Sequence, residues 1–213
     1  MIKVAIQGEL GSYSSIAAKK HFGDAVTIVS EASFPDVFNA IRTGKVKFGL
    51  VPVENSLYGS IFETYDLLLK HKYYIQSELR LKINHHLLSL KKIKLREIEK
   101  IYSHPQALGQ CSSFLQSLSK CEVVPAYDTA GSAKYLVENP TKPWAILASD
   151  ETAKIYNLKV LKKNIQNNNE NFTRFLVISK KRNSKNIYNP KSSICFELKS
   201  MPGALFKALS VFA

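Results

Sequence analysis

Residues 48–56 read Phe48-Gly49-Leu50-Val51-Pro52-Val53-Glu54-Asn55-Ser56, an uncharged apolar run followed at once by a carboxylate, an amide and a hydroxyl. A short run of this kind is typical of a strand that is buried within a sheet. In α/β sheets, ligands bind beyond the carboxyl ends of the strands, where helices begin. The stretch therefore predicts a buried strand with a candidate site at its end, although a surface turn would suit the same three polar residues.

Strand and helix patterns alternate on both sides of this stretch. Strands are predicted at Ile2–Ile6, Val26–Val29, Ile98–Tyr102, Val123–Ala126, Trp144–Ala148 and Phe175–Ile178, and Tyr73–Leu88 is rich in strand patterns. Helices are predicted at Ser14–Phe22, from Ser33 to Gly44, and at Phe62–Lys70, Pro105–Leu118, Thr129–Val137 and Glu151–Tyr156. This alternation predicts an α/β fold with mostly parallel strands.

The C-terminal part of the chain has a different composition. Residues 181–191 are polar and basic and are typical of a linker. A further strand at Ser193–Leu198 and an apolar helix at Ala204–Phe212 are predicted after it. One strand and one helix cannot bury their own apolar faces.

The chain of 213 residues carries 30 Lys and Arg against 17 Asp and Glu, a net charge of +13. Most of these cations are Lys and they are scattered, whereas readers of nucleic-acid grooves depend on Arg. We therefore interpret the charge as a solvated basic surface, with steering of an anionic substrate as the alternative, and expect no nucleic-acid partner.

Cysteine usage and the N-terminus bear on the compartment. Cys111, Cys121 and Cys195 form an odd set without C-x-x-C spacing, which indicates free thiols in a reducing compartment. The chain begins directly with a strand pattern, and no apolar run approaches the 18 or so residues of a membrane span. We therefore expect a cytoplasmic protein without a membrane partner.

Several junctions where a strand meets a helix carry polar residues. Residues 8–14, the pair Ser103-His104, residues 128–132 and Ser149-Asp150 lie at such junctions, and each also suits a simple helix cap. Arg174 lies between two phenylalanines, which predicts either a partner for a substrate carboxylate or a member of an internal ion pair.

The sequence lacks the motifs of nucleotide-binding and zinc sites. Residues 8–14 form neither a dinucleotide-binding nor a P-loop motif, and His85-His86 does not have the spacing of a zinc site. The remaining hydroxyls and amides, with one Glu, one His and one Arg, suit an anionic small molecule. They fit a reaction that depends on positioning of the substrate and transfer of one proton, and depends less on a strong nucleophile.

Four segments together resemble the prephenate dehydratase family over nearly the whole chain. They are Gln7-Gly8-Glu9-x-Gly11-Ser12-Tyr13-Ser14, Val51-Pro52-Val53-Glu54-Asn55-Ser56-x-x-Gly59, Ser103-His104-Pro105-Gln106-Ala107-Leu108-x-Gln110-Cys111 and Asn171-Phe172-Thr173-Arg174-Phe175. The tail Met201-Pro202-Gly203-Ala204-Leu205-Phe206 resembles the start of that family's regulatory ACT domain, which has a ferredoxin-like fold.

The resemblance implies a two-lobed catalytic domain over residues 1–180, similar to a type II periplasmic binding protein, with the active site in the cleft between the lobes. Lobe one would comprise residues 1–78 and 160–180, and lobe two residues 79–159. A linker at 181–191 and an ACT fragment at 192–213 would follow. The implied activity is that of a carbon–oxygen lyase, which converts prephenate to phenylpyruvate, water and CO2 without a cofactor or metal.

Site residues follow from the same resemblance. The implied catalytic residues are Thr173, near the leaving hydroxyl, and two pairs, Glu54 with Ser103 and Asn55 with Gln110. The implied substrate-binding residues are Ser12, Ser56, His104, Thr129, Arg174 and Phe175. Part of a phenylalanine site would lie at Gly203, Ala204, Leu205 and Phe206, and we expect no phenylalanine inhibition without the rest of the ACT domain.

Two alternative functions stay open at this point. An arogenate dehydratase would perform the same chemistry on the aminated substrate, and no sequence feature separates the two. A small-anion-binding protein of the same fold would use the cleft without catalysis. The resemblance also implies a homodimer or homotetramer.

Overall fold

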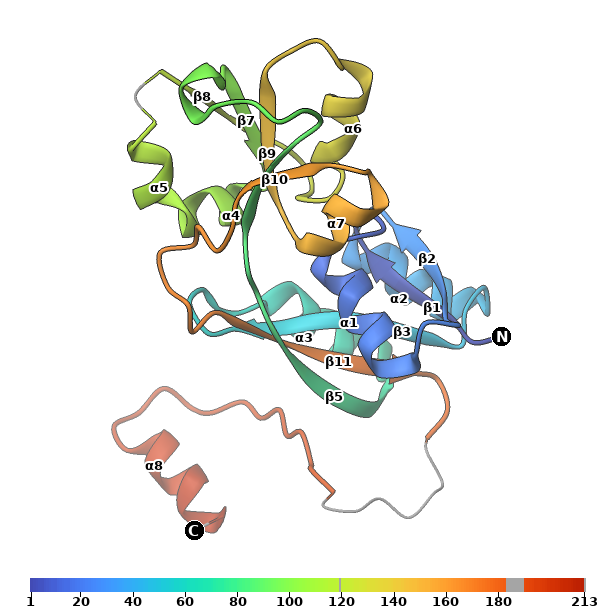
Figure 1. The fold of residues 1–213 in the computed structure, drawn as a ribbon. Helices are drawn as coiled ribbons and strands as arrows, with labels where there is room; N and C mark the ends of the chain where they lie inside the picture. The colour runs from blue at the N-terminus through green and yellow to red at the C-terminus, as the bar shows by residue number, and fades with distance from the viewer. Residues whose placement is uncertain (119, 183–189, 213) are drawn as a thin grey trace. The chain divides into compact units, whose positions relative to one another are not determined.

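The computed structural model describes residues 1–118, 120–182 and 190–212 (Figure 1). It divides into two compact units, Met1–Asn183 and Ser184–Ala213. The first unit contains two sheets, each covered by helices, and the chain passes between them twice. Each sheet with its helices forms one lobe, so the predicted two-lobed α/β architecture is confirmed.

The first lobe is built on a sheet with the strand order β2-β1-β3-β11-β5, and β4 pairs with β3. Its strands are β1 (Lys3–Gln7), β2 (Thr27–Glu31), β3 (Phe48–Asn55), β4 (Gly59–Ser60), β5 (Tyr74–Lys82) and β11 (Phe172–Ser179). Its helices are α1 (Tyr13–Phe22), α2 (Phe34–Thr43) and α3 (Phe62–His71). Apolar residues of α1 pack on one face of the sheet and those of α2 and α3 on the other, which gives two cores.

The second lobe is built on a sheet with the strand order β10-β6-β9-β7-β8. Its strands are β6 (His86–Ser89), β7 (Lys100–Ser103), β8 (Glu122–Pro125), β9 (Trp144–Ala148) and β10 (Lys159–Lys162). Its helices are α4 (Pro105–Gln110), α5 (Ser112–Gln116), α6 (Ser132–Glu138) and α7 (Asp150–Ile155), with a 3-10 turn at Leu95–Glu97. The single helix predicted at Pro105–Leu118 is therefore two helices that meet at Cys111.

The prediction of mostly parallel strands is wrong. Of the nine strand pairings, the four of β1 with β2 and β3 and of β7 with β8 and β9 are parallel, and the other five are antiparallel. The antiparallel strands β5, β6, β10 and β11 flank the two passages between lobes, where the chain reverses direction. Because β5 ends at Lys82 and β6 begins at His86, the first passage lies at residues 83–85. Because β10 ends at Lys162 and β11 begins at Phe172, the second lies at residues 163–171, so both are a few residues later than predicted.

The C-terminal unit contains the short helix α8 (Ala204–Leu209), followed by a 3-10 turn at Ser210–Phe212. The strand predicted at Ser193–Leu198 does not form, because a strand needs a hydrogen-bonded partner and these residues have none among those described. Most of the predicted linker, residues 181–191, lies outside the described residues. Nowhere in the described parts is a helix long and apolar enough to cross a bilayer.

Candidate active site

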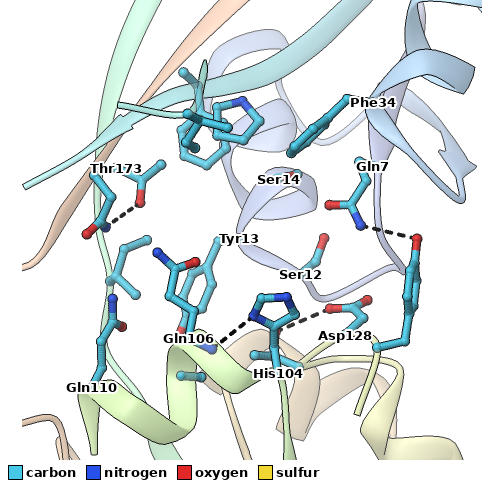
Figure 2. Close-up of a pocket in the computed structure, with 18 of the residues that line it drawn as sticks. Gln7, Ser12, Tyr13, Ser14, Phe34, His104, Gln106, Gln110, Asp128 and Thr173 are labelled. Carbon is cyan, nitrogen blue, oxygen red and sulfur yellow. Dashed lines mark hydrogen bonds between the residues drawn. The ribbon is translucent and has the colours of Figure 1, made fainter. Parts of the chain in front are cut away.

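A cavity of about 450 Å³ lies between the two lobes (Figure 2). Its walls come from the end of β3, the start of β11 and the starts of α1, α2, α3 and α4. Seven of the predicted site residues line it: Ser12, Asn55, His104, Gln110, Thr129, Thr173 and Phe175. The predicted cleft therefore brings together residues that are up to 163 positions apart, from Ser12 to Phe175.

The strand pairing of β3 with β11 positions Thr173. In the register of these antiparallel strands, Thr173 lies opposite Asn55. Because side chains alternate between the faces of a strand, Thr173 and Phe175 share one face and Arg174 takes the other. Both Thr173 and Phe175 face the cavity and are buried.

Asn55 determines how the Thr173 hydroxyl is used. The Asn55 amide nitrogen Nδ2 lies 3.0 Å from Thr173 Oγ1, and its oxygen Oδ1 accepts from the backbone N–H groups of Leu57 and Tyr58. Since a backbone N–H can only donate, these two bonds fix the orientation of the Asn55 amide. The Thr173 oxygen is thus an acceptor towards Asn55, which leaves its proton for an acceptor in the cavity.

The same orientation continues through a chain of buried side chains. Asn55 Nδ2 donates to Asn171 Oδ1 at 2.8 Å, and Asn171 Nδ2 donates to Gln110 Oε1 at 2.8 Å. Gln110 Oε1 also lies 2.7 Å from His85 Nε2, which must carry a proton because the amide oxygen only accepts. We refer to Asn55, Asn171, Gln110 and His85 as the amide chain.

His85 is the titratable end of the amide chain. Burial lowers the pKa of its imidazole to about 4, so the ring is neutral near neutral pH. Its Nδ1 lies 3.0 Å from the Tyr13 hydroxyl oxygen, and the backbone oxygen of Asn84 lies 2.6 Å from the same oxygen, so both acceptors share the one hydroxyl proton. Burial likewise raises the pKa of Tyr13 well above its usual value. Both groups therefore stay neutral at the pH of most cells.

The opposite side of the cavity is formed by helix starts. Ser12 caps α1 by accepting from the Ser15 N–H at 3.3 Å, and His104 caps α4 by accepting from the Gln106 N–H at 3.2 Å. Burial lowers the pKa of His104, while the charge of Asp128 raises it in part. These helix starts place backbone N–H groups and the positive ends of helix dipoles around the cavity.

The family model for prephenate dehydratase matches residues 4–183, which include every residue of the cavity wall. The chain belongs to the prephenate dehydratase family. The match confirms the family that the four sequence segments resemble.

Individual relatives agree with this family. The chain is 41% identical over its whole length to "Arogenate dehydratase 2" of Petunia hybrida and covers 54% of that protein. A prephenate dehydratase of Arthrobacter aurescens, solved in complex with L-Phe, has a TM-score of 0.82 at 24% identity, with 99% of this chain and 72% of that one covered. This second likeness shows the fold. The chain spans about half the length of the curated relatives it matches.

A third similar protein has a different description. The solved structure of GqqA, described as "a novel type of quorum quenching acylases", has a TM-score of 0.77 at 26% identity, with 97% of this chain and 75% of that one covered. Proteins with this fold have therefore been described with more than one activity.

Four residues that the family resemblance implied lie outside the cavity wall. Arg174 contacts Glu78 at 2.6 Å and Glu54 at 3.8 Å, so the internal ion pair forms, and its predicted contact with a substrate carboxylate stays a prediction. Ser103 is fully buried in the second lobe and donates to the Leu147 oxygen, so the predicted pair of Glu54 with Ser103 is not formed. Strand alternation explains the positions of Glu54 and Arg174, which point away from Asn55 and Thr173.

Two further predicted contacts also differ. Ser56 is exposed, and its hydroxyl bonds the backbone of Glu170 and Phe172, which holds the end of β3 against the start of β11. Asn55 and Gln110 do not bond each other directly; Asn171 lies between them. Asn171 belongs to one of the four family-like segments, but the sequence predicted no role for it. A sequence does not show which side chain forms hydrogen bonds to two others and so connects them.

Tyr13, His85 and Asp128 line the cavity without a site role predicted from the sequence, although Tyr13 and Asp128 belong to two of the strand–helix junctions. His85 was considered only as a metal ligand. Its place two residues after Ile83 and two before Leu87 follows a period-two apolar pattern, which could have indicated an inward side chain. Among the described residues, no group of three or more His, Cys, Asp or Glu side chains could hold a metal ion.

Proposed function

We propose that this chain catalyses the decarboxylating dehydration of prephenate, or of its aminated analogue arogenate, in the cavity between the lobes. The observation that carries the proposal is the Thr173 hydroxyl, held by Asn55 at 3.0 Å in the cavity wall of a chain of this family. The product is phenylpyruvate from prephenate, or phenylalanine from arogenate.

The reaction itself sets what the protein must supply. The bond between the ring and its carboxylate breaks and releases CO2, and its electron pair enters the ring. The carbon–oxygen bond at the opposite corner of the ring breaks, and the hydroxyl leaves with the electron pair of that bond and takes up one proton that comes from water, so that it departs as water. Because the ring becomes aromatic, the driving force lies within the substrate, and placement with stabilisation of the leaving oxygen is sufficient.

Thr173 stabilises the leaving oxygen in this proposal. A free threonine hydroxyl is a very weak acid, so it cannot simply give up its proton at neutral pH. Because Asn55 occupies an acceptor position of Oγ1, the hydroxyl is oriented as a hydrogen-bond donor towards the cavity. It can therefore stabilise negative charge on the departing oxygen and relay a proton from water.

The starts of α1 and α2 support binding of the substrate carboxylates. Each of these helices has ten residues, and Ser12, Ser14, Ser33 and Phe34 from their first turns line the cavity. Helix N-termini bind carboxylates through free N–H groups and the helix dipole. They supply the anion contacts that the sequence assigned to Arg174.

The proposal also covers the cofactor, the effector, the oligomeric state and the location of the protein. No cofactor is needed for the chemistry described. A phenylalanine effector would involve Gly203–Phe206, which lie in the C-terminal unit. We also propose that the protein is a homodimer or homotetramer and that it is located in the cytoplasm, as expected from the sequence.

The experiment is a direct assay of the purified chain, prepared from a host strain that lacks its own dehydratase. We expect phenylpyruvate from prephenate, read by ultraviolet absorbance, or phenylalanine from arogenate, read by chromatography. A folded protein that binds either substrate but forms neither product would contradict the proposal and favour the small-anion-binding alternative.

A further inference from the structure

The charges in the cavity wall have one sign. Among the described residues that line it, the carboxylate side chains are Glu63 and Asp128, and there is no Lys or Arg. This contrasts with the chain's net charge of +13. Both carboxylates would face a substrate that itself carries two carboxylate groups. A cation in that substrate would remove the conflict.

Asp128 is the buried member of this pair, with 8% of its surface exposed. Its Oδ2 accepts from the Glu9 N–H at 2.8 Å, and its Oδ1 accepts from the Ala130 N–H at 3.2 Å and the Thr129 hydroxyl at 3.3 Å. A carboxylate has about four acceptor positions. One position, on Oδ2, is therefore available to a ligand.

Asp128 has no direct Lys or Arg partner among the described residues, and the charge of Lys134 acts on it only at longer range. The Lys134 ammonium pairs with Glu9 at 2.7 Å, and across the described ranges no Lys or Arg forms an ion pair with Asp128. A largely buried carboxylate without a cation is costly in free energy. The position is therefore suited to a cation that arrives with the substrate.

The place of Asp128 relative to Thr173 decides which part of the substrate it meets. Figure 2 shows the two residues on opposite sides of the cavity. In prephenate and arogenate, the leaving hydroxyl and the three-carbon side chain occupy opposite corners of the ring. With the hydroxyl at Thr173, the side chain extends towards the side of Asp128.

The two substrates differ in that side chain alone. Arogenate carries an ammonium group where prephenate carries a ketone, so its net charge is −1 rather than −2. We infer that Asp128 makes this chain selective for arogenate by accepting a hydrogen bond from the substrate ammonium. This inference rests on the proposed function. A ketone oxygen can only accept, so it cannot bond the carboxylate and is repelled by it.

The test compares kcat/KM for arogenate and prephenate in the wild type, in Asp128→Asn and in a control. Asn keeps the shape of the side chain and removes its charge. Glu122→Gln is the matched control, because it removes one negative charge from the same lobe at an exposed ion pair outside the cavity. The ratio of the two kcat/KM values cancels any loss that comes from folding alone.

We expect the wild type to prefer arogenate by at least about tenfold, as a hydrogen bond to a charged group allows. Asp128→Asn should lower this ratio about tenfold or more, and Glu122→Gln should leave it unchanged. If the wild type uses prephenate equally well, or if Asp128→Asn lowers both values alike, the inference is overturned. If folded protein turns over neither substrate, the proposed function itself fails.

If Asp128→Asn does not fold, the wild-type ratio of the two kcat/KM values and inhibition by the two products still test the inference. Phenylalanine, which keeps the ammonium, should compete with substrate more strongly than phenylpyruvate, which has the ketone. The reverse order would overturn the inference.

Discussion

The two faces of β11 carry different kinds of polar group. On the cavity face, Thr173 bonds Asn55, and every partner along the amide chain is uncharged near neutral pH. On the other face, Arg174 forms ion pairs with Glu78 and Glu54, and these side chains are between 29% and 50% exposed. Residues that are neighbours in the sequence thus lie in opposite electrostatic surroundings.

This difference shows how the cavity is organised. Neutral groups can be buried when every donor meets an acceptor, whereas charges are costly away from water. The direction of each hydrogen bond on the cavity face follows from the backbone N–H groups of Leu57 and Tyr58. The cavity face is therefore oriented before substrate arrives, and the outer face contributes mainly to stability. Four variants test this comparison.

The largest effect is expected at Thr173. Thr173→Val keeps the shape of the side chain and removes the hydroxyl, so kcat should fall about 100- to 1000-fold, as for the loss of a donor to a developing oxyanion. KM should change little, because in the proposed mechanism the hydroxyl acts on the leaving oxygen. Steady-state kinetics measure both, and Thr173→Ser is the control that restores a hydroxyl. A valine variant with near-normal kcat would remove Thr173 from the mechanism.

Asn55→Asp tests the orientation of the Thr173 proton. The substitution replaces the donating Nδ2 with an oxygen that faces Thr173 Oγ1 and Asn171 Oδ1, both acceptors at present. The Thr173 hydroxyl should then donate to the introduced carboxylate instead of to the cavity. We expect kcat to fall roughly 10- to 100-fold, together with a lower free energy of unfolding from urea titration. Full kcat in a folded variant would show that the hydroxyl needs no such orientation.

His85 should make stability depend on pH. Burial lowers its folded-state pKa from 6.5 to about 4, so between these values the unfolded chain binds a proton that the folded chain lacks. Stability is therefore lost as pH falls through this window, by about 2 kcal/mol between pH 7.5 and pH 5. Urea unfolding of the wild type and His85→Gln at both values isolates this contribution, because the other histidines are common to both. Equal pH dependence in the two proteins would show that His85 is not the group involved.

Arg174→Gln should have the smallest effect on activity. Because the side chain lies on the outer face, KM should stay within about threefold, and the partly exposed ion pair should contribute about 1 kcal/mol or less to unfolding. Kinetics and urea unfolding of the same preparation check both values. A KM raised tenfold or more would return Arg174 to the role of a carboxylate partner.

The sequence predicted the α/β class, most helices and strands of the first unit, and seven residues of the cavity wall. These elements have strong local signals, such as the Ser33 cap before α2 and the apolar run of β3. The antiparallel strands were not predicted, because pairing partners far apart in the chain leave no local signal. The strand at Ser193–Leu198 was predicted from apolar residues alone, and a strand pattern does not supply its own partner.

The roles within the candidate site divide in the same way. The sequence by itself determined the family and the residue types that gather at strand ends, since these are written in short motifs. Only the tertiary structure decided that Thr173 faces the cavity while Arg174 does not, that Asn171 joins Asn55 to Gln110, and that Asp128 meets the cavity without a Lys or Arg partner among the described residues. The physical reason is that orientation depends on strand register and on packing between lobes, and both are set by contacts more than a hundred residues apart.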